Sequence, residues 1–184
     1  MQPLFFIGYM ASGKTTFGKA LAKKLNRKFI DLDEYIEEKY QCTVSQIFKE
    51  KGEKEFREIE SESLKEVSIL EDAVISCGGG TPCFNNNMEY INRHGISVFL
   101  EADTEVLKRR LIEGGTSRPL VAGKSEKELE NTIVEQLQKR LQYYKQAHIR
   151  WDSSHLESEE EIATSVSNFL EKFLQTSDVF SNFV

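Results

Sequence analysis

Apolar positions along the chain fall into two alternating patterns. Short unbroken apolar runs are typical of buried strands, whereas apolar residues that recur three or four positions apart are typical of amphipathic helices. The short runs predict five strands, at residues 4–7, 28–31, 73–76, 97–100 and 149–151. The helical patterns lie at residues 15–25, 33–40, 53–70, 104–112, 126–147 and 159–173. Because strands that alternate with helices build βαβ units, we expect an α/β fold around a buried, mainly parallel sheet.

The chain has 184 residues, a length that favours one domain with a small lid or insertion. We expect this domain to span residues 1–174. Residues 113–124 contain three glycines and the pair Arg118-Pro119 without clear periodicity, which predicts a mobile lid. Residues 175–184 carry a single charge and are expected to form a loose tail.

Charge and composition narrow the class of protein. Lys and Arg total 24 against 30 Asp and Glu, a formal charge of −6, whereas general binding to nucleic acid or to an anionic membrane needs an excess of cations. No apolar run approaches the roughly 18 residues of a membrane helix, and three cysteines make no disulfide framework. We expect a cytoplasmic protein that binds neither nucleic acid nor membrane.

One motif carries a strong chemical signal. Residues 8–15, Gly-Tyr-Met-Ala-Ser-Gly-Lys-Thr, match the pattern G-x-x-x-x-G-K-[ST] and lie between the first predicted strand and an amphipathic helix. Glycines let successive backbone N–H groups face a phosphate, and the start of the helix adds unpaired donors and a positive dipole end. Lys14 can reach the β- and γ-phosphates, and the Thr15 hydroxyl can bind Mg²⁺. The alternative is a glycine turn that merely starts a helix.

The nucleotide is expected to be Mg–ATP or Mg–GTP. The chain has neither the Asn-Lys-x-Asp guanine signal nor a D-x-x-G switch segment, which disfavours a GTPase. Asp31 and Asp33 lie at the carboxyl end of the second predicted strand and point the same way, so both can line one cleft. One carboxylate can support Mg²⁺ while the other accepts a hydrogen bond from an acceptor hydroxyl. The alternative for either residue is helix N-capping.

Two arginines lie on predicted helices. Arg57 is four residues after Glu53 and three before Glu60, which by itself favours a solvated helical ion pair. Arg140 falls inside the apolar stripe of its helix, so its guanidinium must find an anion or reach the rim. Arginine also suits bidentate capture of a carboxylate.

Two further segments belong to the same edge of the predicted sheet. Gly78, Gly79 and Gly80 follow the third strand, where they allow close approach to a ligand or simply a sharp strand exit. Arg118 precedes a proline in the predicted lid, a place from which it could be delivered to the transferring phosphoryl oxygens.

Together these residues resemble the shikimate kinase family, small P-loop kinases of aromatic amino-acid biosynthesis. The resemblance covers residues 4 to about 173 in the same order. It is carried by the extended P-loop at 8–18, the D-x-D segment at 29–33, the G-E-x-x-F-R-x-x-E stretch at 52–60, the triple glycine at 78–80, the lid residues 118–120, and Arg140, Tyr144 and Ala147 of the late helix.

The resemblance implies a P-loop kinase three-layer sandwich with a lid and a helical substrate-binding segment at about 33–62. The implied reaction transfers the γ-phosphoryl group of ATP to the 3-hydroxyl of shikimate, on the route to chorismate, with Mg²⁺ as cofactor. The implied catalytic residues are Lys14, Asp33 and Arg118. ATP would contact Ala11, Ser12, Gly13, Lys14, Thr15, Thr16, Arg110 and Arg118. Shikimate would contact Asp33, Arg57, Gly79, Gly80 and Arg140, and Mg²⁺ would be held by Thr15 and Asp31.

Some alternatives stay open at this point. Arg109 could replace Arg110 beside adenine, because the spacing to Arg118 is one residue longer than is usual in the family. A kinase of another small acid or polyol, such as gluconate, fits the same residue types. An ATP-binding regulatory switch is the alternative from another class, and it would turn over ATP without regard to small acids. We expect a monomer.

Overall fold

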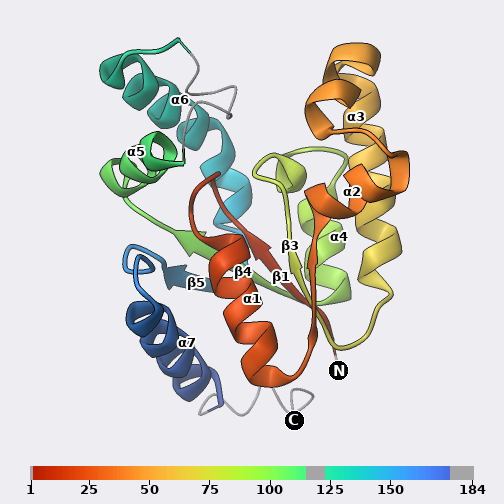
Figure 1. Cartoon of the computed structure of the whole chain (residues 1–184). Coiled ribbons are helices and arrows are strands. Elements are labelled where there is room, and N and C mark those ends of the chain that lie inside the picture. Colours follow the sequence, from red (N-terminus) through yellow and green to blue (C-terminus); the bar gives the residue numbers. More distant parts are fainter. Residues whose placement is uncertain (1, 115–122, 175–184) are drawn as a thin grey trace.

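The computed structural model describes residues 2–114 and 123–174. Five strands form one sheet in the order β2-β3-β1-β4-β5, and each of the four pairings is parallel (Figure 1). The strands are β1 (Leu4–Ile7), β2 (Lys28–Asp31), β3 (Ala73–Ser76), β4 (Ile96–Glu101) and β5 (Ile149–Asp152). The five strands predicted from the apolar runs are therefore confirmed.

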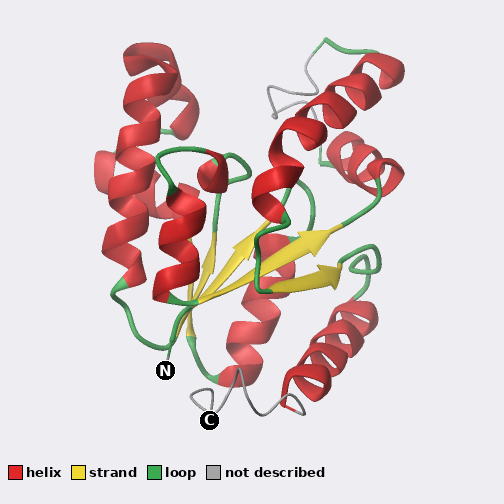
Figure 2. Cartoon of the chain, turned by 180° about the vertical axis from the view of Figure 1, so that it is seen from behind, coloured by secondary structure: helices red, strands yellow, loops and turns green. Residues whose placement is uncertain are grey.

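Helices cover both faces of this sheet and make three layers (Figure 2). They are α1 (Lys14–Leu25), α2 (Leu32–Tyr40), α3 (Val44–Ser68), α4 (Asn87–His94), α5 (Thr104–Glu113), α6 (Glu126–Tyr144) and α7 (Glu159–Leu174), with a short 3₁₀ turn at Thr81–Cys83. Alternate residues of the buried strands face opposite layers, as the two-residue period requires. Phe5 packs towards α2, α3 and α4, while Phe6 packs towards α1 and α7.

The helix predicted at 53–70 begins much earlier than expected. Helix α3 starts at Val44, where the Thr43 hydroxyl accepts the Gln46 N–H and the Gln46 side chain accepts the Thr43 N–H. This reciprocal capping box satisfies two donors that a helix start leaves free. Gly52 has φ 78° and ψ 170° and therefore kinks the helix between its two parts. A glycine of this kind ordinarily ends a helix, which is why the pattern predicted a start only after it.

Helix α4 and the 3₁₀ turn were not predicted. Only Met88 and Ile91 of α4 are buried apolar residues, too few for a recognisable period. The helix nevertheless completes the crossover from β3 to β4. Most of the predicted lid, Arg118 included, and the tail at 175–184 lie outside the described residues.

The topology places three loops at one edge of the sheet. Parallel strands β1, β2 and β3 end there together, as the pairing of Asp31 and Phe6 with Ser76 shows. The P-loop follows β1, Asp31 and Asp33 lie at the end of β2 and just after it, and the glycines at 78–80 follow β3. This carboxyl edge is where open α/β sheets bind ligands. Within the described residues, no helix is both long enough and apolar enough to cross a membrane.

Gly95 joins α4 to β4 at a point of close backbone contact. A Cβ there would lie 2.3 Å from the Pro3 carbonyl oxygen and 2.6 Å from the Phe5 ring. Gly95→Ala must push β1 and β4 apart, so we expect the free energy of unfolding to fall by about 2–3 kcal/mol in urea denaturation. Glu89→Ala, on the exposed side of α4, is the control and should change it by about 0.5 kcal/mol or less. Equal stability of the two variants would contradict this packing.

Candidate functional site

The P-loop wraps its lysine in backbone carbonyls. Lys14 is buried and its Nζ donates hydrogen bonds to the carbonyl oxygens of Gly8, at 3.0 Å, and Tyr9, at 2.8 Å. Burial lowers the Lys14 pKa to about 8, although the nearby carboxylates of Asp33 and Asp31 oppose this shift. The amine thus sits at the centre of the loop, desolvated and held by neutral acceptors that an anionic phosphate would outcompete.

Asp31 caps α2 and also contacts the P-loop helix. Its Oδ1 accepts the Asp33 N–H at 3.1 Å and caps α2, while its Oδ2 accepts the Thr15 hydroxyl at 2.8 Å. A carboxylate and a hydroxyl oxygen side by side are ligands of the kind that Mg²⁺ prefers. The donor set of Thr15 and Asp31 therefore fits a magnesium ion beside the phosphates.

Asp33 lies close to the same lysine. Burial raises its pKa to about 6, and the carboxylates of Asp31 and Glu60 add to this shift while Lys14 opposes it. A Cβ on Gly78 would lie 2.9 Å from Asp33 Oδ1 and 3.0 Å from Glu60 Oε1. The absence of a side chain at Gly78 is what lets these groups approach, and it leaves a carboxylate that can exchange a proton near neutral pH.

Arg57 is not the solvated ion-pair partner that its helical spacing favoured. Its side chain is only 13% exposed, and Nη1 donates to the buried Glu60 at 2.9 Å. Nη2 donates to Glu53 at 3.2 Å, and the guanidinium carbon lies 4.2 Å from the centre of the Phe84 ring. The helical spacing could not show this burial, because Phe84 comes from the segment after the glycine loop and covers Arg57 only in the folded chain.

Arg140 reaches the same loop from α6. A Cβ on Gly79 would lie 3.2 Å from Arg140 Nη1, and a Cβ on Gly80 would lie 2.7 Å from Arg57 Nη1. Two guanidinium groups from different helices thus converge on adjacent glycines. Among the described residues no carboxylate pairs with Arg140, in contrast to Arg57.

The structure distinguishes the two arginines of α5. Arg110 Nη2 donates to the Ser153 carbonyl at 2.9 Å, and its Nη1 lies 3.5 Å from the Ala11 carbonyl oxygen. It lines a cavity of about 230 Å³ with Ala11, Gly13, Lys14, Thr15 and Thr16. Arg109 is half-exposed and donates to Glu157 on the outer side. Arg110 is therefore the arginine beside the P-loop.

Four residues near the site were not singled out from the sequence as site residues. Glu60 holds Arg57, Glu157 binds both arginines of α5, and Tyr9 and Tyr144 border Arg140. Only Glu60 had a local signal, its position three residues after Arg57. The Ser12 hydroxyl is buried in the P-loop with no hydrogen-bond partner among the described residues.

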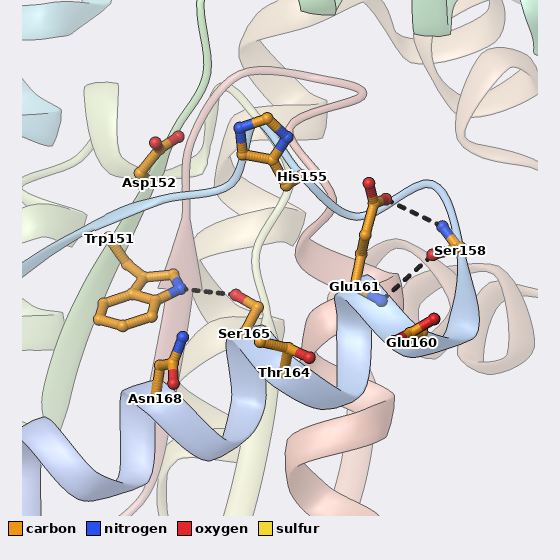
Figure 3. A pocket seen from close by; sticks show the side chains of 9 residues that line it. All are labelled: Trp151, Asp152, His155, Ser158, Glu160, Glu161, Thr164, Ser165 and Asn168. Carbon is orange, nitrogen blue, oxygen red and sulfur yellow. Dashed lines mark hydrogen bonds between the residues drawn. The ribbon is translucent and has the colours of Figure 1, made fainter.

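A larger hollow of about 540 Å³ lies elsewhere, between the end of β5 and α7 (Figure 3). None of the predicted site residues lines it. Hydrogen bonds join residues of its lining, because the Trp151 indole donates to Ser165 and Glu161 accepts from the Ser158 N–H. This hollow is therefore separate from the phosphate site.

Comparison with known proteins agrees with this geometry. A model of the shikimate kinase family matches residues 10–171. A shikimate kinase from Bacteroides fragilis is 50% identical over 166 residues, which are 90% of this chain and 93% of the relative. Another from Bacteroides thetaiotaomicron is 47% identical over 171 residues, or 93% of this chain and 98% of the relative.

Solved structures give the same result. The crystal structure of shikimate kinase from Bacteroides thetaiotaomicron superposes with a TM-score of 0.91 at 46% identity and covers 94% of this chain and 98% of that one. A shikimate kinase from Acinetobacter baumannii in complex with shikimate superposes with a TM-score of 0.84 at 28% identity, covering 97% of this chain and 96% of that one. The chain belongs to the shikimate kinase family.

Proposed function

We propose that the protein transfers the γ-phosphoryl group of ATP to the 3-hydroxyl of shikimate and releases 3-phosphoshikimate and ADP. The observation that carries this proposal is the convergence of Arg57 and Arg140 on the glycine loop beside Lys14 of the P-loop. A phosphate site and a carboxylate site would then lie next to each other. The family membership and the shikimate complex of the Acinetobacter baumannii relative support the same assignment.

ATP would bind along the P-loop. The backbone from Ala11 to Thr16 would hold the phosphates at the start of α1, where free N–H groups and the helix dipole favour an anion. Arg110 would lie beside the adenine because it lines the same cavity. Arg118 of the lid would contact the phosphates. Thr15 and Asp31 would hold Mg²⁺, which when bound neutralises charge on the phosphates.

Shikimate would bind on the other side of the glycine loop. Arg57 and Arg140 would hold its carboxylate, with Gly79 and Gly80 leaving room for the ring. Asp33 would accept a hydrogen bond from the 3-hydroxyl. Its mostly deprotonated state at neutral pH, set by a pKa of about 6, suits a group that takes up a proton.

The chemistry follows from this placement. The 3-hydroxyl oxygen attacks the γ-phosphorus, the bond to the β–γ bridging oxygen breaks, and the hydroxyl proton passes to Asp33. The transition state spreads negative charge over the phosphoryl oxygens, which Lys14 and Arg118 would stabilise. Two of the three N–H donors of Lys14 bond to the Gly8 and Tyr9 carbonyls, which leaves the third for a phosphoryl oxygen.

The remaining features of the proposal concern the whole molecule. We expect one kinase domain at residues 1–174, with a substrate-binding segment at about 33–62 and a lid at about 113–124. A monomer suffices, because one chain supplies every group named above. A cytoplasmic location agrees with the free thiols of Cys42, Cys77 and Cys83.

The reaction is tested by measuring ADP release with Mg–ATP and a panel of hydroxylated acids and polyols that includes shikimate and gluconate. We expect turnover that depends on shikimate, with loss of shikimate matching formation of its 3-phosphate. Preference for gluconate would favour the other acceptor class. ATP turnover that ignores every small acid would favour a regulatory switch and contradict the proposal.

Arg140→Lys tests the carboxylate site. Lysine keeps the charge but loses the planar pair of donors, so we expect the KM for shikimate to rise about tenfold while the KM for ATP stays within twofold. Arg93→Lys is the control, because Arg93 is an exposed arginine of α4 whose side chain is 72% accessible. Equal weakening of both substrates would remove Arg140 from the acceptor site.

Asp33→Asn tests the proton acceptor, because it should lower turnover while it raises the stability of the ligand-free protein. We expect turnover at saturating substrates to fall at least about 100-fold, because the amide oxygen cannot take up the proton. The ligand-free variant should nevertheless be more stable than wild type above pH 6. The Asp33 pKa is about 6 in the folded protein against an ordinary 3.8, so the folded state binds the proton more tightly.

That difference sets the direction of the pH dependence. The free energy of unfolding of wild type falls as the pH rises from about 4 to about 6, because Asp33 must then lose its proton in the folded state. Above that range this fall is complete. The asparagine side chain does not titrate, so urea denaturation of the variant and of wild type at each pH isolates this loss. We expect Asp33→Asn to gain about 1–2 kcal/mol at pH 8, a gain that vanishes near pH 4. A gain independent of pH would contradict the raised pKa.

A further inference from the structure

One face of α6 carries three polar residues, each about one helical turn after the last. Gln136, Arg140 and Tyr144 are four residues apart and therefore share a face. This face lies over the P-loop and the glycine loop, because Gln136 contacts Tyr9 and Tyr144 contacts Gly79. Arg140 lies between these two contacts.

Tyr144 joins α6 to the glycine loop. Its ring is fully buried against Phe99, with ring centres 5.1 Å apart, and its hydroxyl donates to the Gly79 carbonyl oxygen. Burial raises its pKa, so the phenol keeps the proton that it donates. A Cβ on Gly79 would lie 3.2 Å from Arg140 Nη1. The hydrogen bond therefore ties α6, which carries Arg140, to the loop beside the guanidinium.

Tyr9 borders Arg140 from the P-loop. The Arg140 guanidinium carbon lies 5.4 Å from the centre of the Tyr9 ring, within cation–π range. The Tyr9 hydroxyl donates to Gln136 Oε1 at 3.0 Å, which fixes the ring against α6. The carbonyl of the same residue accepts the hydrogen bond from Lys14. Tyr9 thus contacts both the phosphate-binding lysine and the acceptor-side arginine.

Arg140 has no other anchor of comparable strength. Among residues 2–114 and 123–174 no carboxylate forms an ion pair with it, whereas Arg57 is held by Glu60 and Glu53. An unpaired guanidinium on a long side chain loses rotamer entropy when it is fixed. Neutral aromatic partners can restrict the guanidinium without neutralising its positive charge, which then remains available to attract a carboxylate ligand.

We propose that Tyr144 and Tyr9 are positioning residues that hold Arg140 ready for the carboxylate of the acceptor. This inference rests on the function proposed above. Carboxylates position Arg57, whereas tyrosines position Arg140. The positive charge of Arg57 is therefore partly neutralised before the ligand binds, and that of Arg140 is not. Arg140 would supply most of the attraction for the acceptor carboxylate, because its own charge is not already paired.

Tyr144→Phe and Tyr9→Phe remove one hydroxyl each and keep the ring. We expect each to raise the KM for shikimate about fivefold, the value of one lost hydrogen bond, with kcat and the KM for ATP within twofold. Tyr143→Phe is the matched control, because Tyr143 is adjacent on α6 and its hydroxyl has no hydrogen bond among the described residues. A fall in kcat without the selective rise in the shikimate KM would contradict the positioning role.

A double-mutant comparison with Arg140→Lys separates positioning from general structure. If the tyrosines act through the guanidinium, Tyr144→Phe should raise the shikimate KM by less than twofold when Arg140→Lys is already present. The same fivefold rise in both backgrounds would overturn the inference. The inference is also overturned if wild type phosphorylates shikimate, Arg140→Lys does so poorly, and both Phe variants have a normal KM for shikimate. Wild type that releases no ADP with shikimate would instead overturn the proposed function, and this inference with it.

Discussion

Three consecutive residues without side chains let the charged groups of the site meet. A Cβ on Gly78 would lie within 3.0 Å of Asp33 and Glu60, one on Gly79 within 3.2 Å of Arg140, and one on Gly80 within 2.7 Å of Arg57. A side chain at any of the three would displace a charged group that comes from a different helix. The rest of the site depends on this space, because a carboxylate and two guanidinium groups can approach one ligand only across bare backbone.

Each of the three cations around that loop has a different kind of partner. Backbone carbonyls hold Lys14, two carboxylates hold Arg57, and tyrosine side chains border Arg140. Burial of a charge is costly unless polar groups satisfy it. Only the partners of Arg57 are charged, so its positive charge is partly neutralised, whereas neutral groups contact Lys14 and Arg140.

The arrangement of the chain was largely predictable because local signals agreed with it. Buried strands such as 4–7 and 73–76 consist of apolar residues that have no other place in an α/β fold, and their parallel pairing follows from the helices between them. The errors have physical causes. Gly52 bends α3 without ending it, so the part of α3 before Gly52 was missed. Helix α4 buries only two apolar side chains, too few for a recognisable period.

The sequence by itself was enough to predict a phosphate site, because Gly13, Lys14 and Thr15 are neighbours along the chain and form a local motif. It could also bring Asp31 and Asp33 to the same edge, since strand ends in a parallel sheet lie together. Only the tertiary structure decided that Phe84 covers Arg57, that Arg110 rather than Arg109 faces the P-loop, and that tyrosines border Arg140. These contacts join residues far apart in the chain, and their geometry depends on how whole helices pack against the sheet.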